Sequence, residues 1–391
     1  MSDWKTVKIG DVCETLQGDC SMKAAEFKKL GDYVKIKTGK LDANASSDDG
    51  EYPFFTCSIE PLKISSFSYD CECCLVAGNG DLNVKYYNGK FDAYQRTYII
   101  ESLDKEKLDV MYLYFFLCSY IEVLRKQSIG GVIKYIKLGN LTDALIPIPS
   151  LEKQKKICRN LIKAQKVLNE NQALFSKYDI LIKSRFIEMF GDNPTENGKW
   201  NIEKIEDVCT VTSSKRIYAE EQSTTGVPFL RISDLVSRIN GNPINDLFIP
   251  NSKFKEFQTQ GLVPSVNDIL ITSRGTLGLC YIIKPEDEFY FQDGMITWLA
   301  FKNHNKVLSV FIDWLFKSIL KTKIDNETNG ATVKYVSISD LKKLQIPVPP
   351  LELQNDFAAF VQQIDKSKFA VQKSLEKAET LYKSLMQEYF N

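Results

Sequence analysis

Residues 130–154 read GGVIKYIKLGNLTDALIPIPSLEKQ, and residues 330–354 read GATVKYVSISDLKKLQIPVPPLELQ. In both stretches a Lys-Tyr pair is followed by isoleucines or valines alternating with prolines, and then by Leu-Glu-x-Gln. The ends of the two copies also match, with LIKSRFIEMFG starting at Leu181 and LYKSLMQEYFN at Leu381. Solenoid repeats recur at roughly 20 to 50 residues, which is much shorter than this repeat. The sequence therefore predicts two duplicated domains, and duplication suggests a target with two similar halves.

The two copies also begin alike, because KIGDVC at 8–13 and KIEDVC at 204–209 each follow a tryptophan. A chain of 391 residues exceeds what one hydrophobic core usually serves. The predicted divisions are a first domain at 1–150, a central helix at 151–191, a second domain at 192–350 and a C-terminal helix at 351–391.

Two long helices are predicted from the stretches that follow the prolines. Residues 151–190 contain no proline or glycine, and their apolar residues alternate at spacings of four and three, as do those two hundred positions later. This spacing is typical of a coiled-coil seam. A helix of this length runs about 60 Å, too far for one small domain to cover, so we expect the helices to pair, antiparallel if the chain returns through the second domain. The positions expected in the seam are Leu161, Leu168, Phe175, Ile182, Val361, Ile364, Leu375 and Tyr382.

Asn171 and Lys368 interrupt these apolar stripes. We favour a position at a partly exposed edge of the helix pair for both. The alternative is that they fix the register, as single polar seam residues do in coiled coils.

Each domain is expected to be a mixed α/β (α+β) unit. Helical patterns at 108–126 and 308–322 precede each proline stretch. Short β-type runs bounded by glycine, asparagine and aspartate dominate the rest. Examples are 33–37, 74–77, 97–100, 229–232 and 269–272.

The domains diverge most at glycine turns. Residues 76–83 align with 272–278, and Tyr94-Gln95-Arg96 aligns with Phe291-Gln292-Asp293. A shared scaffold with different residues at the turns is what two recognition domains of different specificity would show. Drift after duplication would leave the same pattern, and the sequence does not separate the two.

Composition predicts a cytoplasmic protein without cofactors. No apolar run approaches the 18 residues of a membrane span, and the first residues lack the apolar core of a signal peptide. Cys71, Cys73 and Cys74 form no CxxC pair, and His304 is the only histidine, so no metal site is expected. The formal charge is zero, but 151–191 carries nine basic and four acidic residues. Specific contacts rather than bulk charge would then govern recognition of a nucleic acid.

Catalytic motifs are missing from the sequence. There is no GxxxxGK[ST] loop for nucleotide hydrolysis, and no tetrapeptide with an acidic or amide residue, two prolines and an aromatic, as adenine methyltransferases use. His304 lies in a polar stretch that we expect to be an exposed loop. The chain is therefore predicted not to be an enzyme.

This organisation resembles the specificity subunit of type I restriction-modification systems, and the resemblance spans essentially the whole chain. Residues 146–154, 183–200 and 346–354 carry it. The resemblance implies that each variable domain reads one half of a split target in double-stranded DNA, with the helices as a spacer. It also implies methyltransferase subunits, expected to be two, and restriction endonuclease or translocase subunits as partners, and no membrane.

Candidate DNA contacts are polar and basic residues at glycine turns and strand ends. Arginine pairs with guanine and glutamine or asparagine with adenine, whereas lysine mostly meets phosphate. The competing hypothesis is a coiled-coil scaffold that joins proteins without binding DNA, which leaves these polar turns unexplained. The candidates are Lys37, Lys40, Asn79, Gln95, Arg96, Lys134, Ser213, Lys215, Arg216, Arg231, Arg274, Thr276, Gln292 and Lys334.

Overall fold

A computed structural model describes residues 26–195, 198–274, 278–301, 305–317 and 337–390. The chain forms two compact units, one made of 1–174 with 370–391 and the other of 175–369. Each unit holds one mixed domain and parts of helices α4 (Leu151–Phe190) and α11 (Leu351–Phe390). The expectation of two α+β domains joined by a pair of long helices is confirmed.

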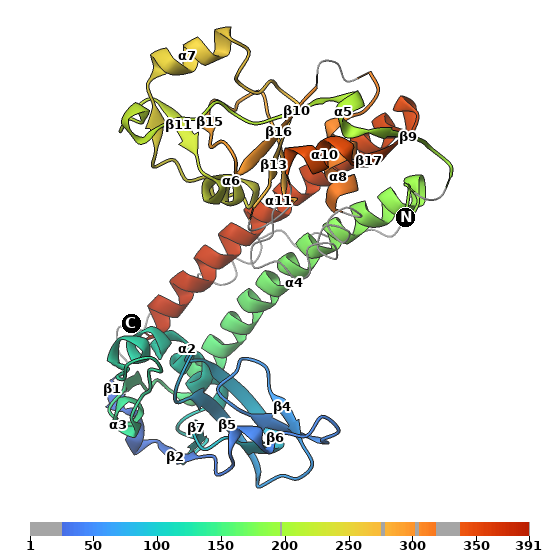
Figure 1. The fold of residues 1–391 in the computed structure, drawn as a ribbon. Coiled ribbons are helices and arrows are strands. Elements are labelled where there is room, and N and C mark those ends of the chain that lie inside the picture. Colours follow the sequence, from blue (N-terminus) through green and yellow to red (C-terminus); the bar gives the residue numbers. More distant parts are fainter. Residues whose placement is uncertain (1–25, 196–197, 275–277, 302–304, 318–336, 391) are drawn as a thin grey trace. The chain divides into compact units, whose positions relative to one another are not determined.

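The first domain is built on a six-stranded sheet (Figure 1). Its order is β2-β7-β5-β6-β3-β4, and every neighbouring pair is antiparallel except β6 with β3. The strands are β2 (Val34–Thr38), β3 (Tyr52–Phe55), β4 (Leu62–Ile64), β5 (Tyr69–Ala77), β6 (Val84–Ala93) and β7 (Thr97–Ser102).

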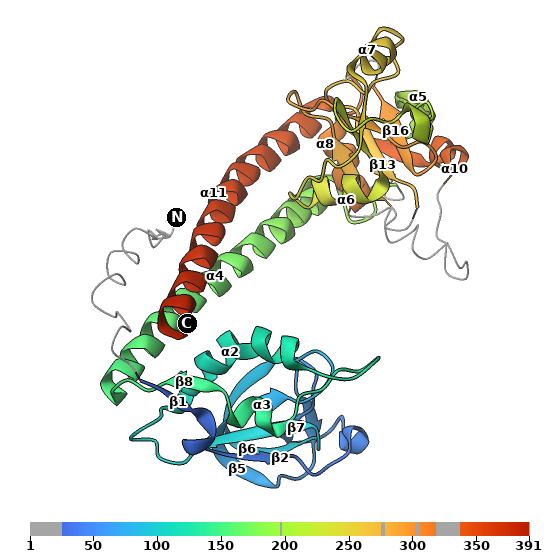
Figure 2. The same ribbon diagram turned by 90° about the vertical axis from the view of Figure 1, so that its left-hand side faces the viewer.

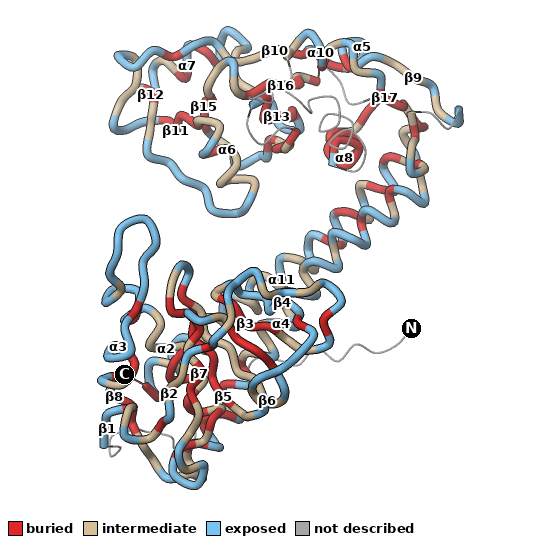
Figure 3. Tube along the Cα trace, turned by 60° about the horizontal axis from the view of Figure 1, so that its bottom comes forward, coloured by how far each residue is buried: buried red, intermediate tan, exposed pale blue. Residues whose placement is uncertain are grey.

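Helix α2 (Val110–Gln127) covers one face of this sheet (Figure 2). Side chains alternate between the two faces of a strand, so Cys74 and Val76 belong to the core that includes α2, whereas Cys73 and Leu75 belong to a cluster on the other face. Figure 3 shows the buried stretches of β5 and β7. Burial raises the pKa of the Cys74 thiol, so this cysteine packs as a small neutral side chain.

The second domain repeats the sheet in two pieces. In the larger piece, the strand order β10-β16-β13-β14 matches β2-β7-β5-β6 of the first domain. In the smaller piece, β12-β11-β15 matches β4, β3 and the end of β6. The parallel pair is also repeated, because β11 runs parallel to β15 as β3 does to β6. Helix α8 (Ser309–Leu315) packs on this sheet as α2 does on the first. The strands are β10 (Thr210–Thr212), β11 (Val227–Leu230), β12 (Phe248–Ile249), β13 (Ile269–Thr272), β14 (Cys280–Ile282), β15 (Tyr290–Phe291) and β16 (Ile296–Ala300).

One expected strand ends early. Residues 229–232 were predicted to be extended throughout, but β11 ends at Leu230 and helix α6 (Ile232–Ile239) begins two residues later. Asp234 causes the change, because its carboxylate accepts a hydrogen bond from the Arg231 N–H at 2.9 Å and so closes the first turn of the helix.

The start of the first domain also differs from the expectation. Strand β9 (Asn201–Lys204) pairs with β17 (Gln345–Val348), whereas β1 (Phe27–Lys29) takes the same place beside β8 (Leu145–Pro147). The N–H groups that follow, of Leu30 and Ile205, donate to Ala144 and Leu344 at 2.8 and 3.0 Å. The structural equivalent of 204–209 is therefore 29–34, although the sequence of 204–209 also resembles that of 8–13. Residues 8–13 themselves lie outside the described part of the chain.

Short helices complete both domains. They are η1 (Leu30–Asp32), η2 (Ala43–Ala45), α3 (Leu138–Thr142), α5 (Ile205–Val208), η3 (Ala219–Glu221), α7 (Asn251–Thr259) and α10 (Ile338–Lys343).

Helices α4 and α11 each have 40 residues and run antiparallel where they meet. In the first unit Asn160 bonds to Tyr389 and Asn171 to Ser374, at 3.3 and 3.0 Å. In the second, Lys368 bonds to Asp179 at 2.7 Å, so positions rise along one helix as they fall along the other. Of the eight expected seam residues, Leu161, Ile182, Val361 and Ile364 are buried, and Leu168, Phe175, Leu375 and Tyr382 are half-buried.

The two polar interruptions of the stripes have defined partners on the opposite helix. Asn171 meets Ser374, and the Lys368 ammonium lies 4.7 Å from the ring centre of Phe175 beside Asp179. Both side chains are half-buried, as expected for an edge of the pair. Their bonds also fit a single register of the two helices, as required by the alternative hypothesis that Asn171 and Lys368 fix the register.

Each domain core includes the end of the helix that begins at the other domain. In the first unit the ring of Phe390 lies 5.2 Å from that of Tyr112 on α2. In the second, the ring of Phe190 lies 4.9 Å from that of Phe311 on α8 and 5.6 Å from that of Phe357. These aromatic contacts bury the last turn of each long helix.

A fully buried glutamine fixes the first turn of each long helix. Gln154 accepts from the Asp109 N–H at 2.9 Å and donates to the carbonyls of Lys107 and Pro149 at 2.8 and 2.9 Å. Gln354 makes the equivalent bonds to Leu308, Lys306 and Pro349. Both are the last residue of a Leu-Glu-x-Gln motif, so the two copies of the motif have the same structural role.

Replacing Gln354 with leucine tests this clamp. The change keeps the volume but leaves a buried N–H and two buried carbonyls without their partner, and each such group costs about 1–3 kcal/mol. We expect the free energy of unfolding to fall by about 3 kcal/mol, measured by chemical denaturation. Gln362→Leu, at an exposed position of α11, should change it by less than about 0.5 kcal/mol. Equal losses in the two variants would contradict a stabilising clamp.

Candidate nucleic-acid interface

In the first domain, the predicted contacts gather around the turn that follows β5. The Gly78 N–H donates to the Arg96 carbonyl at 2.8 Å, and the Gly80 N–H to the Lys134 carbonyl at 2.9 Å. The Gly39 N–H donates to the Thr97 carbonyl at 3.0 Å, which places the end of β2 at the same corner. The predicted residues brought together here are Lys40, Asn79, Gln95, Arg96 and Lys134.

Glycine is required at this corner because the backbones approach closely. A Cβ on Gly78 would lie 2.3 Å from the Arg96 carbonyl oxygen, and one on Gly39 would lie 2.1 Å from that of Ala93. Any larger residue would push the turns apart. The glycines therefore hold the polar side chains of neighbouring residues at one place.

The cations of this corner are available for a ligand. Lys40, Arg96 and Lys134 are exposed, and across the described residues none of the three has a carboxylate within ion-pairing distance. Lys37 behaves differently, since its ammonium lies 2.6 Å from Glu101, whose hydrogen bond raises the pKa of Lys37. Lys37 is thus engaged within the sheet.

The second domain places its candidates around the turn that follows β15. The Ser273 N–H donates to the Met295 carbonyl at 2.9 Å, the counterpart of the bond between Gly78 and Arg96. This bond brings the exposed Arg274 to the turn. The Gln292 N–H donates to Leu230 at 2.9 Å, and Ser213 accepts from the Gly294 N–H at 3.3 Å.

Two further candidates flank this turn. Arg216 is ion-paired with Asp293 at 2.8 Å, and the hydrogen bond raises the pKa of Arg216. The Lys215 N–H donates to the Tyr290 hydroxyl at 2.9 Å, and the Lys215 ammonium lies 5.4 Å from the ring centre of Phe257. Lys253, which the sequence analysis did not select, lies 5.5 Å from the same ring, and its ammonium is ion-paired with Glu221. The sequence signal for its contact with Phe257 was its position four residues earlier, because residues four apart are neighbours on a helix.

Arg231 has bonds that give it a structural role. Its guanidinium donates to Asp234 at 2.8 Å and to both oxygens of Asp246 at 2.7 and 2.8 Å. These carboxylates raise the pKa of Arg231, with the bond to Asp234 contributing most. Of the other predicted residues, Thr276 and Lys334 lie outside the described part of the chain, as does His304.

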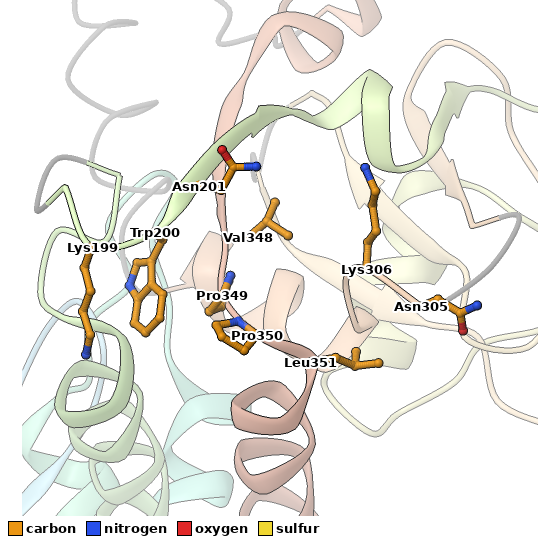
Figure 4. A pocket seen from close by; sticks show the side chains of 9 residues that line it. All are labelled: Lys199, Trp200, Asn201, Asn305, Lys306, Val348, Pro349, Pro350 and Leu351. Carbon is orange, nitrogen blue, oxygen red and sulfur yellow. The ribbon is translucent and has the colours of Figure 1, made fainter.

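A separate cleft of about 470 Å³ lies in the second unit where α11 begins (Figure 4). Trp200, Pro349 and Pro350 supply its apolar lining, and Lys199 and Lys306 its cations. The Trp200 indole donates to the Phe190 carbonyl at 2.9 Å, so the cleft wall is tied to the end of α4. The set contains no pair of acid and base groups suited to catalysis.

The described residues also offer no grouping of three or more histidine, cysteine, aspartate or glutamate side chains suited to a metal ion. None of the described helices is long and apolar enough to cross a membrane.

Two equivalent domains that each present polar turns at one corner, carried on two long helices, define a duplicated recognition protein. The family model of the type I restriction modification DNA specificity domain matches residues 1–173 and again 197–379, and the chain belongs to this family. The two matches agree with the internal duplication. Type I specificity subunits recognise DNA targets and are not catalytic, so the prediction that the chain is not an enzyme is confirmed.

Curated relatives and solved structures agree over nearly the whole length. The specificity subunit of the EcoDI enzyme of Escherichia coli is 25% identical over 93% of this chain and 87% of its own. That of the MjaVIII enzyme of Methanocaldococcus jannaschii is 23% identical over 98% and 91%. The crystal structure of an S subunit from M. genitalium has a TM-score of 0.62 at 17% identity and covers 94% of this chain and 97% of its own. This last likeness shows the fold.

Removing single charges at the corner of the first domain tests whether this corner binds DNA. Lys134→Ala should weaken DNA binding on all sequences and lower the salt-dependence slope by about 1, whereas Arg96→Ala should cost about 1–3 kcal/mol and relax base preference. Lys37→Ala is the matched control and should bind like the parent, because Glu101 already neutralises Lys37. Binding is measured by fluorescence anisotropy on a duplex carrying the cell's methylated motif. Equal losses in all three variants would contradict this assignment.

Proposed function

We propose that each domain reads one half of a split DNA target, using the corner where its polar turns meet. The observation that carries this proposal is that equivalent backbone positions hold chemically different side chains. Asn79 of the first corner corresponds to Arg274 of the second, given the matching bonds of Gly78 and Ser273. Asparagine suits adenine and arginine suits guanine in the major groove, so the two corners would select different bases.

Other positions keep the same chemistry in both domains. Lys40 and Lys215 follow the equivalent strands β2 and β10, and both are exposed. Lysines at matched places suit phosphates, which fix the position of a protein on DNA without reading sequence. We therefore assign the lysines to the DNA backbone and the divergent turn residues to the bases. The helix pair would set the distance between the half-sites.

The proposed role includes directing two methyltransferase subunits, and endonuclease or translocase subunits, to the bound DNA. Support comes from helix α4 within the second unit, where Ile180 and Ile187 are exposed, Ile180 at 64%. Residues seven apart share one face of a helix, so these isoleucines form an apolar stripe turned away from the seam. One of the solved neighbours concerns complex assembly of the type I restriction-modification system. A scaffold that binds no DNA would leave the two corners without a use.

Domain replacement tests the proposed division of labour. Exchanging residues 34–136 for the equivalent region of a relative should change one half of the methylated motif and keep the other, because β1, β8 and the helices stay in place. Methylated adenines are mapped by sequencing DNA from cells that carry the chimaera. A change in both halves would show that the domains do not read independently.

Charged substitutions in the apolar stripe test whether it binds the methyltransferase subunits. Ile180→Asp with Ile187→Asp should abolish co-purification of methyltransferase subunits, since two charges would face the contact. Gln362→Asp, at an exposed position of α11 and so outside this stripe, is the control for added negative charge. Retained assembly in the double variant, with a folded chain by circular dichroism, would place the subunits elsewhere.

A further inference from the structure

The loop between α2 and α3 presents two apolar side chains to solvent. Val132 is fully exposed, with a relative accessibility of 104%, and Ile133 is 63% exposed. Figure 2 shows the chain projecting beyond the C-terminal end of α2 before it returns to α3. Isolated exposed apolar residues are common on protein surfaces, but two adjacent ones at the tip of a projection are placed for insertion.

Backbone hydrogen bonds close the base of this loop. Ile129 and Tyr135 exchange backbone hydrogen bonds at 3.0 and 2.9 Å, which closes a hairpin. Gly130 adopts a φ of +119°, and a Cβ there would lie 2.6 Å from the Ile133 carbonyl oxygen. Only glycine fills this position of the hairpin without strain.

Backbone hydrogen bonds connect the hairpin to the proposed DNA-reading corner. The Gly80 N–H donates to Lys134, and the Ile136 N–H donates to Gly78, both at 2.9 Å. The Tyr98 hydroxyl also donates to the Ile136 carbonyl at 3.2 Å. These bonds attach the returning strand of the hairpin, at Lys134 and Ile136, to the turn that carries Asn79, so the tip lies next to that turn in the chain's fold.

The charges around the tip favour a polyanion as its ligand. Lys134 follows Ile133 directly, and Arg96 lies across the Gly78 turn. Arg125, at the end of α2, is instead held by Asp81 and Glu122 at 3.0 and 2.5 Å. Apolar side chains flanked by unpaired cations are what DNA-bending proteins use, with the cations on phosphates and the apolar wedge between base steps.

We infer that Val132 and Ile133 form a wedge that enters the first half-site and unstacks one base step. The inference rests on the proposed reading of DNA by this domain. Unstacking costs a few kcal/mol per step and kinks the duplex. Burial of the two side chains between bases offsets part of that cost. The wedge would add sensitivity to how easily a sequence deforms, beyond the base edges read by neighbouring side chains.

The test uses the full chain with its methyltransferase subunits and the motif found by mapping methylated adenines. Duplexes carry 2-aminopurine, which brightens when unstacked, at each position of the half-site in turn except the methylated adenine and its neighbours, because a methyltransferase extrudes its target base by itself. The parent should raise the fluorescence several-fold at one step. Val132→Ser with Ile133→Ser should lose this signal and bind about ten-fold more weakly. A duplex with an abasic site at that step should restore most of the lost affinity.

Leu103→Ser is the matched control, because Leu103 is 60% exposed at the opposite end of β7, and it should keep both signal and affinity. Specific binding by the parent without brightening at any position would overturn the wedge and leave the reading of the half-site intact. Absence of specific binding by the parent would overturn both. Loss of methyltransferase subunits from the double variant, with unchanged DNA binding, would overturn the wedge in favour of a protein contact.

Discussion

The buried amides of Gln154 and Gln354 are the interaction on which each unit depends. Each amide satisfies one N–H and two carbonyls from different segments. A carboxylate lacks the donors, and a thioether has no donor and is only a weak acceptor. An amide on a side chain of this length can make all three bonds, which join the long helix to α2 or α8. The sheet packs on that second helix and ends in the polar corner. The orientation of each corner relative to its long helix therefore depends on one glutamine.

The duplication and the long helices could be predicted from sequence because their signals are local and periodic. The corners were partly predictable, since glycine turns mark places where strands end. Arg231 shows the limit of this reasoning: its partner Asp246 is fifteen positions away, and nothing in the local sequence reveals that its charge is used inside the domain. The start of the first domain shows another limit. Residues 8–13 and 29–34 both resemble 204–209 in sequence, and the correspondence of 29–34 follows only from the pairing of β1 with β8.

The second sheet shows how one scaffold tolerates different surfaces. The strand order is conserved down to the parallel pair, although β6, with ten residues, is replaced by the shorter strands β14 and β15, with three and two. Core positions are filled by residues of similar size, such as Leu30 and Ile205. The turn between the equivalents of β6 and β7 is Tyr94–Arg96 in one domain and Gln292–Met295 in the other. One added residue thus reshapes a corner without disturbing the sheet beneath it.

The aromatic ends of the two long helices constrain the order in which the chain can fold. Phe390 and Tyr389 belong to the core of the first domain, whose strands are made some three hundred residues earlier. During synthesis the second domain can close around Phe186 and Phe190 as soon as α11 begins. The first domain keeps an apolar face open until the last helical turn leaves the ribosome, and such exposed surfaces favour aggregation. A change in the codons for Tyr389 and Phe390 would therefore damage the first domain, although its strands are encoded far upstream.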